Sequence, residues 1–467
     1  MESLTSLMDL AQQALAADQN ALNVTSNNVA NQNTPGYTRE TVTWQMNDVV
    51  TLSGTSYDSG VTSSASSQRD RVLEQRVQQQ TQTQAQSSAL EGALQQVENV
   101  FGLSSTSSSP ATTALGTAMN SFFNSLSALT ANPSDTSLRQ SVLSAANTLA
   151  STFNSAANQI SQVTAGLNQQ VSGITDQVNS LTATIASLNE KIGSASPNAD
   201  AGLLEDQRQQ SIASLSQLIG LNQIATESNG ITLTTSNGAV LVDGGKSFAL
   251  GTTNVAGVTD VVAGDTGADV TAGLTGGQLG GVLAARDQKI PSYTASLDDL
   301  AYAVGTKVNQ QNALGLDGNG NPGGALFTLP ASATGAAAAI AVATNDPKAV
   351  AAAAAGEGSS GSGNALALAD VSSALIVGGE TAGDYYSGML GQIGSDASAA
   401  STDNTTQQAA LTQLTTQRDS VSRVSLDEEA ANLTQYQRSY QAAAKLFTIA
   451  DSLMADALNL GVQSAVS

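Results

Sequence analysis

The chain of 467 residues contains no cysteine and no histidine. Without these residue types it cannot form disulfides, Cys–His or Ser-His-Asp nucleophile systems, or zinc sites with the usual ligands. The absence of cysteine says little by itself about the compartment in which the protein works. We therefore expect a protein that is not an enzyme and that binds no cofactor and no metal.

Aromatic and charged residues are scarce. Aromatic residues make up 3% of the chain and charged residues 12%, against about 25% charged in typical soluble domains. The cores must then be built from Ala, Leu, Val and Ile, and alanine-rich surfaces suit helices that pack closely. A net charge of −22 argues against nucleic acid, whose phosphates require Lys and Arg, and against an anionic membrane surface.

Long hydrophobic runs are missing as well. No apolar run approaches the roughly 18 residues of a membrane span. The first residues lack the basic region and the apolar core of a secretory signal peptide. By these rules we expect a soluble protein without membrane insertion, and a cytoplasmic one unless another export route recognises it.

What the sequence does contain is long amphipathic helices, one of them at the start. Segment 4–29 repeats apolar or small side chains with a period of about 3.6, which predicts a helix roughly 40 Å long. Asp18 is the one charged member of this stripe. Pro35-Gly36 then suits the central pair of a type II turn, because Pro fixes φ and Gly accepts a positive φ. The remaining stripe members are Leu4, Leu7/Met8, Ala11, Leu15, Leu22, Thr25 and Val29.

A second such helix is predicted at the other end, over about 426–460. Ser425 and Glu428 have the spacing of a capping box, and the acidic first turn suits the positive end of the helix dipole. Gly461 is expected to terminate the helix. Its apolar stripe, at four-three spacing, consists of Leu426, Leu433, Tyr436, Tyr440, Ala443, Phe447, Ala450, Met454 and Ala457.

The strongest periodicity lies between 142 and 192. The spacing alternates four and three, with one extra step of four between Leu167 and Val171, so it is a heptad repeat with a single stutter. A helix of this extent is about 75 Å long and predicts a rod. The stripe consists of Val142, Ala146, Leu149, Phe153, Ala156, Ile160, Val163, Leu167, Val171, Ile174, Val178, Leu181, Ile185, Leu188 and Ile192.

Shorter patterns fill the rest of the chain. We predict further helices over 68–101, 115–129, 278–312 with a kink at Pro291, and 380–424. Segment 37–67, which holds the only tryptophan, Trp44, is β-leaning. Strand-sized runs at 231–235, 239–242 and 248–250 are separated by glycine-containing turns.

These elements predict a mainly α protein with a smaller β-rich insert. We expect an elongated rod of long, coiled-coil-like helices, with the N- and C-terminal helices paired at one end. The predicted domains are a terminal assembly domain of 1–36 plus 426–467, a long-helix rod domain of 37–220 plus 273–315 plus 371–425, and an outer β-rich and Gly/Ala-rich insert of 221–272 plus 316–370.

Two motifs suggest chemistry but fail on context. Asp317-Gly318-Asn319-Gly320-Asn321 begins like a calcium loop, yet Pro322 and Thr328 stand where an EF-hand requires Gly and Glu. The run from Gly356 to Gly361 matches G-x-G-x-x-G, but it follows an alanine run where a dinucleotide site requires a strand. We interpret both as surface turns.

The terminal segments resemble a known family. Asn27-Asn28-Val29-Ala30-Asn31 followed by Thr34-Pro35-Gly36-Tyr37 is similar to the N-terminal signature of bacterial flagellar rod, hook and hook-associated proteins. The run 427–433, then Tyr436-Gln437 and 439–442, resembles the C-terminus of the hook-associated members. Segments 316–324 and 122–139 resemble other parts of the same members. The resemblance covers roughly 1–220, 275–325 and 371–467.

The resemblance implies a structural subunit at the junction between the flagellar hook and the filament. It implies the chain itself, the hook protein, and a second junction protein or flagellin as partners, with an export chaperone. It also implies an extracellular location in the flagellum, reached through the flagellum's own type III export channel without a cleaved signal peptide.

Other interpretations remain open at this point. A flagellar hook or distal rod protein is the nearest alternative, and a secreted coiled-coil binding or adhesion protein is another. The residues that we expect at the assembly interface are Leu4, Leu7, Ala11, Leu15, Leu22, Val29, Asn31, Pro35, Gly36, Tyr37, Leu426, Asp427, Glu428, Asn432, Leu433, Tyr436, Tyr440, Phe447 and Met454.

Overall fold

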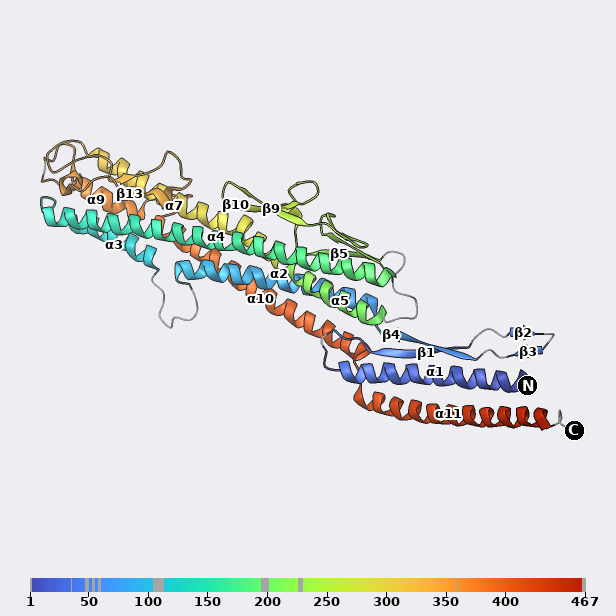
Figure 1. The fold of residues 1–467 in the computed structure, drawn as a ribbon. Helices are drawn as coiled ribbons and strands as arrows, with labels where there is room; N and C mark the ends of the chain where they lie inside the picture. The colour runs from blue at the N-terminus through green and yellow to red at the C-terminus, as the bar shows by residue number, and fades with distance from the viewer. Residues whose placement is uncertain are drawn as a thin grey trace.

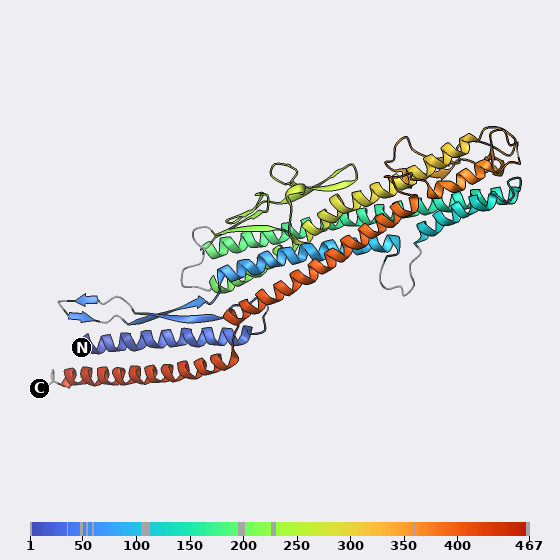
Figure 2. The same cartoon turned by 180° about the vertical axis from the view of Figure 1, so that it is seen from behind.

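The computed structural model is an elongated, mainly helical molecule with two parts (Figure 1). A bundle of long helices forms a rod, and the two terminal helices lie together beyond one end of it (Figures 1 and 2). The predicted mainly α, rod-like fold is therefore confirmed. The structure describes residues 2–34, 36–46, 50–52, 55–57, 60–103, 113–194, 201–225, 230–358 and 360–463.

The rod is built around one long helix, α4 (Thr136–Ser194), which contains the whole predicted heptad stripe. Thirteen members of the stripe are buried, while Val163 and Leu181 are partly buried against the same core. The helices that surround α4 are α2 (Arg71–Phe101), α3 (Ala114–Leu129), α5 (Ala201–Leu218), α6 (Gly277–Ala284), α7 (Ile290–Leu314), α8 (Ala336–Ala339), α9 (Gly363–Asp370) and α10 (Ala382–Ser422).

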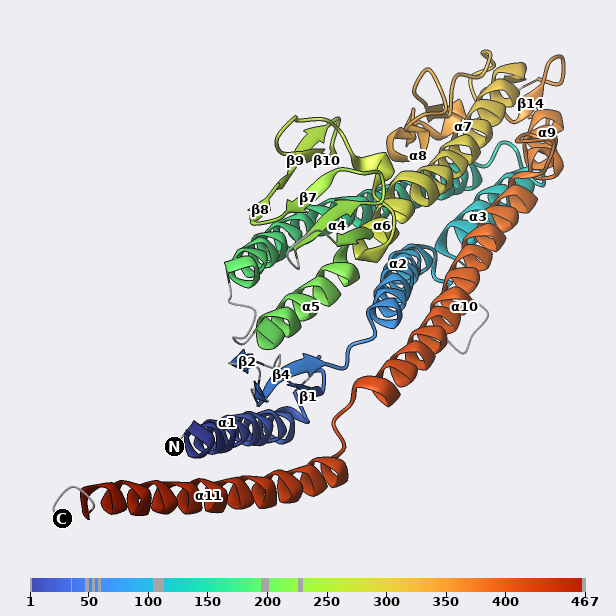
Figure 3. The ribbon, with the colours of Figure 1, turned by 90° about the vertical axis from the view of Figure 1, so that its right-hand side faces the viewer.

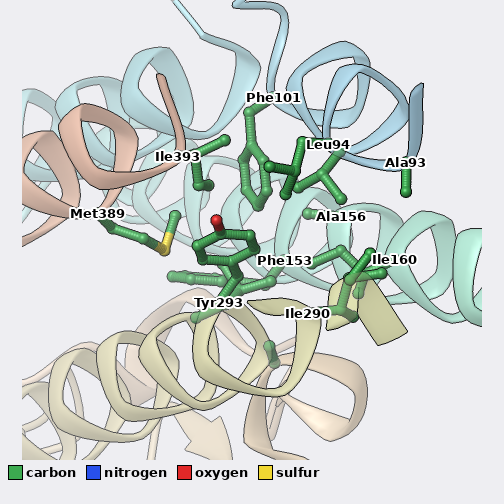
Figure 4. Packing of buried hydrophobic residues seen from close by; sticks show 14 of the residues in the cluster. Ala93, Leu94, Phe101, Phe153, Ala156, Ile160, Ile290, Tyr293, Met389 and Ile393 are labelled. Atoms are coloured by element: carbon green, nitrogen blue, oxygen red, sulfur yellow. The ribbon is translucent and has the colours of Figure 1, made fainter. Parts of the chain in front are cut away.

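The core of the rod is apolar and draws on several helices at once. Phe153 of α4 is fully buried, and Figure 4 shows it beside Phe101 of α2, Tyr293 of α7 and Met389 of α10. The Tyr293 hydroxyl donates a 2.6 Å hydrogen bond to Oδ2 of Asp396 on α10. Burial and this carboxylate both raise the pKa of Tyr293, so the phenol stays neutral and ties α7 to α10.

Local signals explain where these helices begin and end. Asp70 caps α2, since its carboxylate accepts hydrogen bonds from two backbone N–H groups of the first turn, and Gly102 ends the helix at φ +68°. Asp135 accepts from the N–H of Ser137 at the start of α4. The expected kink at Pro291 is a π-helical turn, η3 (Ala285–Lys289), which directly precedes α7.

The predicted β-rich insert lies along the second half of α4 (Figure 3). One prediction inside it is wrong: Phe248 and Ala249 lie between strands, and the next strand begins at Leu250, although the Phe248 N–H still donates to the carbonyl of Leu241 at 2.8 Å. The insert comprises an antiparallel sheet of β5 (Leu221–Ala225), β6 (Ile231–Thr235), β7 (Val240–Asp243) and β8 (Lys246–Ser247), a hairpin of β9 (Leu250–Val255) and β10 (Val258–Ala263), and the 3-10 turn η2 (Thr271–Gly273).

Residues 316–370 pack against the first half of α4, at the far end of the rod from the terminal helices (Figure 1). The buried Arg139 side chain of α4 holds this segment, since it donates hydrogen bonds to the carbonyls of Lys348, at 3.3 Å, and Val350. The short elements here are β11 (Gly315–Leu316), β12 (Phe327–Thr328), β13 (Ala341–Val342), β14 (Ala353–Ala354), η4 (Pro347–Ala349) and η5 (Val371–Ser373).

We expect the Phe153→Ala variant to destabilise the rod by about 3–5 kcal/mol, because the surrounding helices cannot close the cavity. The measurement is urea unfolding of the rod followed by circular dichroism. Asn158→Ala, at an exposed position on the same helix, is the matched control. Equal midpoints for the two variants would contradict the packing described above.

Candidate functional site: the paired terminal helices

The N- and C-terminal helices, α1 (Glu2–Asn31) and α11 (Leu426–Gln463), run antiparallel and side by side. Both termini therefore lie at the same end of the molecule, as the sequence predicts (Figures 1 and 3). The prediction that the helix ends at Gly461 is wrong, since α11 continues to Gln463. Gly461 lies in the last turn of the helix, where a glycine costs less than in the interior.

A long β-hairpin covers the face of α1 that α11 leaves open. Its main strands, β1 (Glu40–Met46) and β4 (Val61–Ser67), pair antiparallel, and β2 (Val50–Leu52) pairs with β3 (Thr55–Tyr57) near the tip. Asn20 of α1 donates to the Ser63 carbonyl at 3.2 Å, and the Ser63 hydroxyl donates to the Ala17 carbonyl. These bonds fix β4 on the helix and confirm the β-leaning segment after the first turn.

Small side chains fill the interior of this terminal unit. Ala17, Ala21 and Val24 of α1 are buried, as are Ala443 and Ala450 of α11. Residues of this size let the backbones approach closely, but each buries little apolar area. The helix pair is therefore held by less hydrophobic free energy than the rod.

The structure places the predicted assembly residues on more than one face. Ala11 is buried, while Leu7 and Val29 of α1 are each 39% exposed, and Leu426 and Tyr440 of α11 are 48% and 37% exposed. Asp427 is also exposed. The partly buried members are Leu4, Leu15, Leu22, Asn31, Tyr37, Asn432, Leu433, Tyr436, Phe447 and Met454.

A second apolar stripe on α11 was missed. Leu446, Ile449 and Leu453 follow one another at three-four spacing and are 53%, 53% and 48% exposed. Leu10 of α1 is similarly exposed. The period of this stripe is present in the sequence. The stripe that faces α1 has the same period, so the sequence alone does not distinguish the two. The missed stripe is an exposed apolar surface on a helix whose other face packs against α1.

A polar node joins the two helices to the start of β1. Glu429, 1% exposed, accepts a 2.8 Å hydrogen bond from Nε of Arg39 and a 3.2 Å bond from Nδ2 of Asn28. The same Asn28 amide donates to the Glu40 carbonyl and accepts from the Glu40 N–H. Glu428, predicted as half of a capping box, lies 2.6 Å from Nη1 of Arg39.

The turn after α1 places Tyr37 against this node. Gly36 has φ +81°, and the Tyr37 N–H donates to the Thr34 carbonyl at 3.2 Å, as a type II turn requires. Pro35 itself lies outside the described residues. The Tyr37 hydroxyl donates to Oδ1 of Asn28 at 2.9 Å, and burial, together with the nearby carboxylate of Glu40, raises its pKa.

The next residues attach the terminal unit to the rod. The Arg39 N–H donates to the Ser422 carbonyl at the end of α10. The Thr38 N–H donates to Asp206 of α5, which also pairs with Arg69. The expected assembly residue Asn31 serves the turn, since its Oδ1 accepts a 3.2 Å hydrogen bond from the Thr34 hydroxyl.

Little in the described part of the chain supports catalysis. A hollow of about 640 Å³ runs beside α2, but glutamine and alanine side chains make up half of its lining. The described residues contain no group of acidic side chains that could hold a metal ion. None of the described helices combines the length and the hydropathy that a membrane crossing needs.

We expect Arg39→Ala to loosen the first turns of α11 by about 3 kcal/mol, because it leaves the buried Glu429 carboxylate without its cation. Glu428→Gln, which alters the 61% exposed partner of the same arginine, should cost less than about 1 kcal/mol. Amide hydrogen exchange of α11 measures both. Similar protection in the two variants would show that the node does not hold the helix.

Family models match three parts of the chain. The model for the flagellar hook-associated protein FlgK helical domain matches residues 94–327, half of the sequence. The model for the flagella basal body rod protein matches 8–38, which contains most of α1, and the one for the flagellar basal body rod FlgEFG protein C-terminal matches 416–460, which contains most of α11.

Individual proteins agree. The chain is 30% identical to flagellar hook-associated protein 1 of Bacillus subtilis over 97% of both chains, and 26% identical to the Escherichia coli protein of that name over 70% of this chain and 60% of that one. The fold is similar to that of the flagellar hook junction protein FlgK from Burkholderia pseudomallei, with a TM-score of 0.68 and 22% identity over 74% of this chain and all of that one. The chain belongs to the family of flagellar hook-associated protein 1.

Proposed function

We propose that the protein is a structural subunit at the junction between the flagellar hook and the filament, where it assembles through α1 and α11. The observation that carries this proposal is the stripe of Leu446, Ile449 and Leu453, which is exposed on a helix that already has a partner. A helix needs only one apolar face to pack within its own chain, so a second face is available to a neighbouring subunit.

Assembly then completes the folding of the terminal unit. Full burial of a Leu or Ile side chain contributes about 1.5–3 kcal/mol relative to exposure. The three side chains are about half exposed, so burying them would add roughly half of that each, whereas the alanine-rich pairing of α1 with α11 offers little. The terminal helices should therefore be marginal in the free subunit and well ordered in the polymer.

The surrounding organisation follows from this role. We propose the hook protein and a second junction protein or flagellin as neighbours, a dedicated export chaperone, and passage through the flagellar export channel without a cleaved signal. The terminal unit is the assembly domain. The β-rich segment 221–272 and the segment 316–370 form an outer layer on the rod, which carries no catalytic activity.

Two alternatives use the same helices. A hook or distal rod protein would also carry the terminal signatures, but the helical-domain match over 94–327 favours the hook-associated type. An adhesion protein would have no need of flagellar segments at both ends.

Deletion of the gene in its host separates these roles, with electron microscopy of the cell surface and an assay for flagellin in the medium. A junction protein predicts hooks without filaments and flagellin lost to the medium. Cells without hooks would indicate a rod or hook subunit, and normal motile filaments would contradict a flagellar role.

Ile449→Glu combined with Leu453→Glu should prevent incorporation while the purified subunit keeps its fold, because both side chains are exposed before assembly. The expected result is loss of filaments on complementation with an unchanged rod unfolding transition. Ser452→Glu, exposed on the same turn, is the control and should assemble. Normal filaments with the double variant would exclude this stripe from the interface.

A further inference from the structure

Asp18 is the charged residue that interrupts the apolar stripe of α1, and it is buried with 4% of its surface exposed. The hydroxyl of Ser439 on α11 donates a hydrogen bond to its carboxylate, while burial raises its pKa. A buried carboxylate costs free energy, so its place in an otherwise small and apolar interface calls for a structural reason.

A second buried polar contact crosses the same interface. Nδ2 of Asn28 donates to Oε2 of Glu429 at 3.2 Å. Asn28 follows Asp18 by ten residues on α1, and Glu429 precedes Ser439 by ten residues on α11. In antiparallel helices that rise about 1.5 Å per residue, the two contacts therefore belong to one and the same alignment and lie roughly 15 Å apart.

The apolar contacts alone do not fix that alignment. Alanines recur along both helices, so sliding α11 by one heptad replaces one small contact with another. The polar contacts do not tolerate such a slide. In one direction Asp18 would face Leu446 and lose its donor; in the other, where the amide of Asn432 could replace Ser439, the Glu429 carboxylate would leave Asn28 and face the buried Ala21. A buried carboxylate that loses its donor to an apolar neighbour is strongly disfavoured.

We propose that Asp18–Ser439 and Asn28–Glu429 form a two-point register lock, in which these positioning residues set the lengthwise alignment of α11 on α1. In this alignment Leu10 is level with Phe447, and Leu7 is level with Ala450. The exposed leucines of α1 therefore stand at the same height as Leu446, Ile449 and Leu453. This alignment joins the exposed apolar side chains of the two helices into one continuous band. That a neighbouring copy packs on this band rests on the proposed function.

Disulfide cross-linking tests the lock directly, because the chain has no cysteine of its own. Ala14→Cys with Ala443→Cys is the aligned pair, four residues from the Asp18–Ser439 contact on each helix. Ala14→Cys with Ala450→Cys is the matched pair shifted by one heptad, roughly 10 Å along the helix. In the isolated full-length subunit we expect the aligned pair to form its disulfide at least about tenfold faster.

Removing both anchors should abolish this preference. When Asp18→Leu and Asn28→Leu are combined, the ratio of the disulfide-formation rates of the aligned and shifted pairs should fall to about twofold or less. Asp18→Asn, which keeps the hydrogen bond and removes the charge, should preserve that ratio. Helical content by circular dichroism accompanies each measurement. If the double variant loses helix, Asp18→Leu alone, which leaves the Arg39 node intact, carries the test and should lower the ratio about threefold.

A ratio that is unchanged in the leucine variants would overturn the lock, as would equal rates for the two cysteine pairs in the parent sequence. Because the rates are measured in the unassembled subunit, they do not depend on the junction role. A variant that loses the difference between the two disulfide-formation rates and still builds filaments would support the lock. It would also show that assembly does not depend on the lock.

Discussion

The fold depends on the burial of one continuous apolar stripe along α4. Most of the stability of a helix in a protein comes from packing of its apolar face, so every stretch of this stripe needs a partner. The chain supplies them in succession, with α3 and the 316–370 segment at one end, α2, α6 and α7 in the middle, and α5 with the β-rich insert at the other. The length of the apolar stripe on α4 therefore sets the length of the rod.

The terminal unit, in contrast, buries little apolar area between its two helices. Its two helices meet through alanines, while Leu446 and Ile449 remain in solvent. Polar contacts replace apolar area as the source of order: Arg39, Glu429 and Asn28 fix the end that joins the rod, and Asp18 fixes the middle. Polar contacts give alignment more than stability, which suits an element whose final packing comes from other subunits.

The sequence predicts α4 well because its heptad pattern is long and the single stutter does not change the buried face. It predicts the helix ends well where a local cap exists, as at Asp70 and Gly102. It fails where the outcome depends on distant partners. Glu428 has the spacing of a capping residue but meets Arg39, almost 400 residues away in the chain, and no local pattern reveals that contact.

The assembly residues show the same limit. Period alone finds that α1 and α11 are amphipathic, but two stripes of equal period on α11 cannot be ranked without knowing which one faces α1. The node was not predicted for another reason. Asn28 belongs to the N-terminal signature, but no local spacing connects it with Arg39, beyond the turn at Gly36, or with Glu429 near the other end of the chain.

The outer segments are attached to α4 in an unusual way. Asn179 exchanges two hydrogen bonds with the main chain of Leu250, Asn168 does the same with Gly257 and Thr259, and Asn189 donates to the carbonyls of Ile231 and Gly244. These amides recognise peptide groups and ignore the side chains beside them. Substitutions at the solvent-facing side chains of the insert therefore leave its attachment to α4 intact, because the hydrogen bonds involve main-chain atoms that every residue type supplies.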